Sequence, residues 1–194
     1  MLRNSSQTYG WIHIALHWTT ALSVFGLFAL GLWMRTLDYY DTWYYQAPEI
    51  HKSVGILLFG LVGVRLIWRW ANPHPVPLGS PLENRVAHLA HVLLYLLLFT
   101  LMFSGYLIPT AKGRPIDVFH WFNVPATLYG YPHQEDIAGE IHAVLAYVLI
   151  GLVVLHAGAA LKHHWIDRDR TLLRMLGRGA RNTPGPNPAN KEHP

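Results

Sequence analysis

The sequence contains no cysteine. This absence excludes disulfide bonds, iron–sulfur clusters, zinc sites built on thiolates and covalently attached c-type haem. Charged residues are also scarce: Asp, Glu, Lys and Arg make up 13% of the 194 residues, whereas soluble domains usually carry about 25%. Because 52% of the residues are hydrophobic and the mean hydropathy is +0.19, the composition predicts one domain of an integral membrane protein.

Four apolar segments are each long enough to cross a bilayer, which takes about 20 helical residues. We predict an all-α fold, an integral membrane four-helix bundle formed by residues 1–178 within the lipid bilayer. The third helix should stop at Pro109, and the loop 110–138 has room for a short helix in the membrane interface. Residues 179–194, rich in Gly, Pro and Asn, should form a disordered cytoplasmic tail. The helices are expected at about residues 11–34, 51–70, 82–108 and 139–162.

Basic residues outnumber acidic ones, and the isoelectric point is about 9.4. With four spans, the N-terminus, the segment near residue 75 and the C-terminus share one side of the membrane. That side carries 11 Lys and Arg residues, against 4 on the other. The positive-inside rule therefore predicts that both termini are cytoplasmic. Since this topology accounts for the basic residues, we expect no nucleic-acid partner.

The last apolar segment carries two histidines, His142 and His156. At about 100° per residue their imidazoles point to nearly one face, and at about 1.5 Å per residue they lie about 21 Å apart along the axis. A polar side chain inside a membrane needs a partner and is commonly functional. This spacing predicts two metal centres, one near each membrane face. Haem iron is the natural candidate, because imidazole is a common axial ligand of haem.

Two further histidines lie at matching depths. His51, at the outer end of the second helix, matches His142, and His17, near the cytoplasmic end of the first helix, matches His156. Each pair can hold one b-type haem by two axial imidazoles, inside the bundle. The alternative is that each histidine is an isolated polar residue hydrogen-bonded to its neighbours. Four histidines at matched depths on three helices favour the ligand interpretation.

Other histidines leave alternatives open. His13 lies one turn before His17 and is a rival ligand. His88 and His91 share a face of the third helix. They are rival ligands, contacts for haem propionates or a quinone, proton carriers, or a hydrogen-bonded interfacial pair. Two arginines at the end of the second helix can pair with propionates or extend to lipid phosphates. These are Arg65 and Arg69.

Several short motifs occur in order along the chain. They are Leu16–Trp18, Ile50–Gly55, Ala87–His91, Lys112–Phe119, Glu140–His142 and Leu155–Ala157. Together they resemble the bacterial cytochrome b561 family, small di-haem b proteins of the inner membrane, over about residues 9 to 178. The resemblance implies two haem b groups and a four-helix membrane fold. It implies axial ligands at His17, His51, His142 and His156, and it places His88 and His91 outside the ligand shell.

The resemblance also implies a function. Members carry electrons between ubiquinone or another quinone and a further donor or acceptor, and one relative oxidises superoxide. The segment from Tyr39 to Glu49 is aromatic and acidic, and an acidic approach repels the superoxide anion. Lys52, Lys112 and Arg114 would counter this repulsion if they line the entrance.

The leading hypothesis is a di-haem membrane cytochrome that moves electrons between a periplasmic-side donor or acceptor and the quinone pool. The second is a haem-bearing anchor subunit of a larger hydrogenase- or dehydrogenase-type complex with a redox partner protein. The third is a transporter of transition-metal ions. Zinc sites require three or four close ligands, and no intramembrane carboxylate is present to join the histidines.

Overall fold

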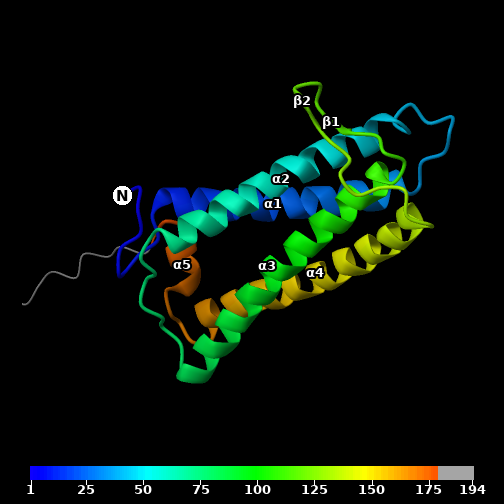
Figure 1. The fold of residues 1–194 in the computed structure, drawn as a ribbon. Coiled ribbons are helices and arrows are strands. Elements are labelled where there is room, and N and C mark those ends of the chain that lie inside the picture. The colour runs from blue at the N-terminus through cyan, green and yellow to red at the C-terminus, as the bar shows by residue number, and fades with distance from the viewer. Residues whose placement is uncertain (179–194) are drawn as a thin grey trace, which may run out of the picture.

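The structure is a computed structural model that describes residues 1–178. Four long helices form the body of the molecule, with a short hairpin at one end and a short fifth helix at the other (Figure 1). All four are long and apolar enough to cross a membrane, so the predicted integral membrane helical bundle is confirmed. The expectation for residues 179–194 falls outside the described residues. The elements are α1 (Trp11–Met34), α2 (Gln46–Trp70), α3 (Pro81–Thr110), β1 (Ile116–Val118), β2 (Phe122–Val124), α4 (Gln134–Trp165) and α5 (Thr171–Met175).

The long helices pack as two pairs. Helix α1 lies against α2, α3 lies against α4, and contacts between α2 and α3 join the pairs (Figure 1). Many large apolar side chains outside the small buried core are exposed, which lipid accommodates and water would not. One apolar cluster holds the middle of the bundle together. Its buried members are Val24, Leu58, Val62, Leu98 and Leu149.

The helices extend beyond the expected boundaries. Helices α2 and α4 each begin five residues earlier than expected, and α3 continues through Pro109 to its last residue. The added first turns carry Glu49 in α2, and Glu135 and Asp136 in α4. Carboxylates are stabilised at the positive end of a helix dipole, so these polar turns continue helices whose apolar parts begin later. Pro109 has no amide to donate to the carbonyl four residues earlier. The helix loses this one hydrogen bond and ends at the next residue.

The loop between α3 and α4 forms a β-hairpin rather than the short interfacial helix for which the sequence left room. Strands β1 and β2 pair antiparallel, and β-branched residues, which favour strands, occupy both. Ile116 and Val118 are buried, and β1 contacts α2. The Ser53 hydroxyl donates to the Asp117 carbonyl and accepts from the Phe119 amide, both at 3.3 Å. The hairpin is therefore fixed beside the end of α2 that carries His51.

The opposite end of the bundle is closed by the linker after α2 and by α5 (Figure 1). Ser80 begins α3 with a capping box, which satisfies amide groups that the helix leaves free. The Trp18 indole donates to the Met175 carbonyl at 2.8 Å, and Arg174 donates to the Val76 carbonyl at 2.7 Å. Helix α5 is thus tied to both α1 and the linker.

Ion pairs also join α3 to the end of α4. Lys162 lies 2.6 Å from Glu83 and 2.8 Å from Asp167, and His163 lies 2.8 Å from Asp169. Burial raises the pKa of Asp169, but hydrogen bonds from the first residue of α5 and the nearby His163 hold this pKa below its ordinary value. Glu83, His163 and Asp167 are close enough to share a metal ion. Since Lys162 already neutralises two of them, we interpret the group as structural.

Candidate functional site

Two pairs of histidines lie between the helices. His51 of α2 and His142 of α4 have ring centres 6.2 Å apart, and His17 of α1 and His156 of α4 have ring centres 6.4 Å apart. Both α4 residues lie on one continuous helix, so about 21 Å of helix rise separates them. The structure therefore brings together the two pairs that the depth argument proposed. We call them the outer pair (His51 and His142) and the inner pair (His17 and His156).

The spacing within each pair leaves room for one metal ion. A bond from imidazole to a metal is about 2.0–2.1 Å long, and the centre of a five-membered ring lies about 1.1 Å from its atoms when the bonds are about 1.35 Å. Two rings on opposite sides of one ion thus have centres about 6.3 Å apart, as observed in both pairs. Neutral imidazoles are usual axial ligands of haem iron, so the donor sets fit b-type haem.

Hydrogen bonds prepare His142 for this role. Its Nδ1 lies 2.9 Å from the Leu101 carbonyl, and because a carbonyl only accepts, Nδ1 carries the proton. The lone pair of Nε2 is then free for a metal, the arrangement that metal-binding histidines usually show. The Nδ1 atom of His51 is buried and has no hydrogen-bond partner within residues 1–178.

Two glycines make room for the outer pair. A Cβ atom on Gly105 would lie 2.8 Å from Cε1 of His142, and one on Gly31 would lie 3.2 Å from Cε1 of His51. Carbon atoms in contact prefer about 3.5–4.0 Å, so a side chain at Gly105 would displace His142. The absence of side chains at these two positions allows the imidazoles to pack against the neighbouring helices.

Arg65 lies against the inner pair. Its guanidinium is 2.7 Å from Nδ1 of His17, and because a guanidinium only donates, Nδ1 is the acceptor here. A neutral His17 that bound a metal through Nε2 would carry its proton on Nδ1. Ligation by His17 therefore requires that Arg65 turns to another acceptor. The guanidinium also lies 5.5 Å from the centre of the Tyr95 ring.

The other candidate ligands, His13 and His91, occupy different positions. The His13 ring stacks on Tyr9 at 4.5 Å, which uses its face for packing. The His91 ring lies 5.3 Å from that of His156, about 1 Å less than two ligands of one ion need. The geometry thus favours His17 as the partner of His156 and places His91 in direct contact with the inner pair.

A cleft of about 270 Å³ opens beside the inner pair, between α2 and α3. Its polar side chains include His88, His91 and Arg69, and the Tyr95 hydroxyl is buried without a hydrogen-bond partner in the part of the chain that the structure describes. Sequence reasoning gave Tyr95 no role of its own. Tyr95 follows His88 and His91 at helical spacing and shares their face of α3. This spacing is the signal by which the sequence could have revealed a role for Tyr95. The apolar lining residues include Leu66, Val92, Leu96 and Phe99.

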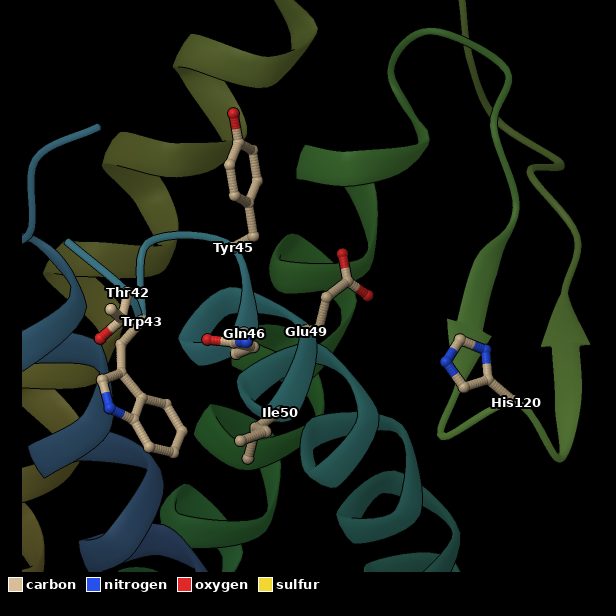
Figure 2. Close-up of a pocket in the computed structure, with 7 residues that line it drawn as sticks. All are labelled: Thr42, Trp43, Tyr45, Gln46, Glu49, Ile50 and His120. Atoms are coloured by element: carbon tan, nitrogen blue, oxygen red, sulfur yellow. The ribbon is translucent and has the colours of Figure 1, made fainter. Parts of the chain in front are cut away.

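A larger groove of about 570 Å³ lies at the end of the bundle that carries the outer pair, beside the residue that precedes His51 (Figure 2). Trp43, Tyr45 and Glu49 come from α2 and the segment before it, and His120 comes from the tip of the hairpin (Figure 2). His120 has a φ angle of 59°, a left-handed conformation that is uncommon for residues other than glycine. The hairpin nevertheless holds this imidazole beside Asp117 at the groove.

Residues 8–178 match the sequence profile of a family described as Prokaryotic cytochrome b561. The chain belongs to this family. It is 52% identical over 179 residues to Cytochrome b561 homolog 2 of Escherichia coli (strain K12), covering 91% of this chain and 95% of that protein. It is 32% identical to Cytochrome b561 homolog 1 of the same strain, covering 85% and 94%. It is 31% identical to Probable superoxide oxidase CybB of Yersinia pestis, covering 87% and 95%.

Membership of the cytochrome b561 family confirms the resemblance found in the sequence. The protein is a membrane electron-transfer protein, and the family implies that it binds haem b. Four membrane-spanning helices in a member of this prokaryotic family indicate the bacterial inner membrane. This membership also sets aside the hypothesis of a metal-ion transporter.

Proposed function

We propose that this cytochrome b561 holds two haem b groups and carries electrons between a donor or acceptor at the outer face and the quinone pool. The observation that carries the proposal is the presence of two imidazole pairs, whose ring centres lie 6.2 Å apart in the outer pair and 6.4 Å apart in the inner pair. The outer ligands would be His51 and His142, and the inner ligands His17 and His156. Haem supplies a one-electron iron couple in each position. The bundle holds the ligands, and its apolar helices exclude water from them.

The two pairs would form two redox sites at different depths in the membrane, between which an electron can pass. Their ligands on α4 are separated by about 21 Å of helix rise, most of the roughly 30 Å hydrocarbon thickness. We place both termini in the cytoplasm, since the side with the termini carries most of the Lys and Arg residues. In this orientation the inner pair lies towards the cytoplasm and the outer pair towards the periplasm.

The cleft beside the inner pair is our proposed site for ubiquinone or another quinone. Its apolar side chains suit a quinone ring, and its polar groups suit the ring oxygens. A quinone oxygen accepts hydrogen bonds, and the Tyr95 hydroxyl and the imidazoles of His88 and His91 can donate them. Reduction of a quinone to quinol consumes two electrons and two protons. His88 is exposed at the inner end and can take protons from the cytoplasm.

This assignment predicts the behaviour of two variants. In His88→Ala and Tyr95→Phe, we expect the KM for a short-chain quinone to rise about tenfold, the effect of losing about 1.4 kcal/mol of hydrogen bonding. The haem content should not change, because neither residue is a ligand. Steady-state quinone reduction by the purified proteins gives the KM, and the pyridine-haemochrome assay gives the haem content. His164→Ala, on the neighbouring helix end, is the matched control, and an unchanged KM in both test variants would contradict the assignment.

Superoxide has to be considered as a donor, because one relative is named a probable superoxide oxidase. Superoxide is an anion, and the groove at the outer pair includes Glu49. The sequence left open that Lys52, Lys112 and Arg114 compensate the acidic charge. In the structure Lys52 lies 2.6 Å from Glu49, and Lys112 lies 2.9 Å from Glu135. Both lysines are thus engaged by carboxylates, and of the three basic residues only Arg114 has no carboxylate partner within residues 1–178. We propose that this single cation does not offset the acidic charge, so that the outer face favours neutral or cationic donors.

A second candidate is supported by the aromatic surface of the outer face. Tyr40 is 92% exposed and Trp121 is 73% exposed, and aromatic side chains are enriched at protein interfaces. The chain would then be the haem-bearing anchor of a larger hydrogenase- or dehydrogenase-type complex. Co-purification of a soluble redox protein from native membranes would favour this candidate, and quinone turnover by the isolated chain would count against it.

The main proposal is tested by counting haems and following electrons. The purified protein should give two b haems per chain in a pyridine-haemochrome assay. In liposomes that contain the protein in a single orientation, with its outer face exposed, a membrane-impermeant reductant added outside should reduce both haems. Haem-free protein would contradict the proposed function, and one haem per chain would contradict the two-site arrangement.

A further inference from the structure

Arg65 is a positively charged residue inside a membrane helix. It lies in α2, which is apolar enough to cross the membrane, and its Nε atom is buried and has no hydrogen-bond partner among the described residues. Within residues 1–178, no carboxylate lies within salt-bridge distance of it. Its observed contacts are neutral groups, the His17 imidazole and the Tyr95 ring. Burying an uncompensated charge is costly, so a compensating role is expected.

The outer pair lies in different electrostatic surroundings. His142 donates to a neutral carbonyl, that of Leu101, and no Lys or Arg of the described residues hydrogen-bonds to either ring of that pair. The nearest basic residue in sequence is Lys52, whose ammonium group lies 2.6 Å from Glu49. The two pairs are therefore chemically alike but electrostatically different.

We propose that Arg65 makes the inner site the stronger electron acceptor of the two, and so directs electrons from the outer site to the inner site. This inference rests on the proposed function. Reduction removes one positive charge from a haem site, and a fixed cation nearby favours that change. For charges about 8 Å apart at an effective dielectric constant near 20, the effect on the equilibrium constant is about thirtyfold. The transfer moves one electron, so the outer site is oxidised, the inner site is reduced and no bond changes.

The effect does not depend on one conformation of Arg65. When His17 acts as a ligand through Nε2, its Nδ1 proton faces the guanidinium donors, and the side chain has to turn away. The Tyr95 ring already lies beside the guanidinium, and the acidic groups of a bound cofactor would be further partners for it. An acidic group weakens the influence of the cation but does not reverse it, because loss of Arg65 still removes one positive charge.

The first test uses proteins that retain one site each. His142→Ala should keep the inner haem, and His156→Ala should keep the outer haem. Redox titration followed by optical spectroscopy should then give a higher potential in His142→Ala than in His156→Ala. The reverse order would overturn the inference. Absence of haem from the wild-type protein would instead overturn the proposed function, so the two failures are distinguishable.

The second test changes the charge at position 65. Arg65→Gln should shift the electron distribution between the sites about thirtyfold towards the outer site, which corresponds to about 90 mV at 59 mV per tenfold change. Arg65→Lys keeps the charge and should keep most of the potential. Arg85→Gln removes a charge from the exposed inner end of α3 and should leave both potentials unchanged. Equal shifts in Arg65→Gln and Arg85→Gln, or no shift in Arg65→Gln, would overturn the inference. Should Arg65→Gln not bind haem, the first test decides alone.

Discussion

His156→Ala is expected to halve the haem b content of the protein and to abolish electron transfer across the membrane. His156 lies 6.4 Å from His17 between ring centres, and alanine would leave the proposed inner site with one of its two imidazoles. The two sites lie about 21 Å apart along α4, and mutations at sites this far apart usually act independently, so the outer site should be retained. The pyridine-haemochrome assay gives the haem content. Vesicles with an impermeant reductant give the rate of electron transfer, which should fall to that of vesicles without the protein.

Two companion variants make this result specific. His142→Ala should remove the outer haem instead, so that the remaining haem has a different potential and absorption maximum. His164→Ala changes a histidine near the end of the same helix and should retain both haems. Full haem content in His156→Ala would contradict the ligand assignment. His91, 5.3 Å from His156, would then be the first residue to examine as the true ligand.

The second large effect is expected from Gly105→Val. A Cβ atom at this position would lie 2.8 Å from Cε1 and 3.0 Å from Nδ1 of His142, well inside the contact distance of about 3.5–4.0 Å. Since the added atom belongs to a packed helix, the imidazole has to move, and its hydrogen bond to Leu101 is lost. We expect Gly105→Val to lose the outer haem and retain the inner one, as measured by haem content and redox titration.

A graded set of glycine variants supplies the control. Gly31→Ala places its Cβ 3.2 Å from the His51 ring, a contact that a small shift can relieve, so partial loss of the outer haem is expected. At Gly26 an added Cβ meets no other atom within 4 Å, and Gly26→Ala should retain both haems. Retention of the outer haem in Gly105→Val would show that the outer pair is not the haem site in this geometry.

The sequence determined the membrane fold and the pairing of the histidines. Four apolar segments of sufficient length cross a bilayer as helices, because a helix satisfies the hydrogen bonds of its own backbone N–H and C=O groups. Helix periodicity then places His142 and His156 on one face at two depths, and the alternation of spans gives the depths of His17 and His51. These are local properties of a chain whose helices are constrained to cross the same membrane.

Only the tertiary structure decided what surrounds each pair. The rotation of α1, α2 and α3 about their own axes is set by side-chain packing between helices, and the sequence pattern does not contain it. This rotation places Arg65 on His17, Tyr95 beneath Arg65, and His91 against His156. The hairpin between α3 and α4 likewise depends on contacts with α2 far away in the sequence. The histidine pairs follow from periodicity and depth, and the charge that distinguishes them follows from packing.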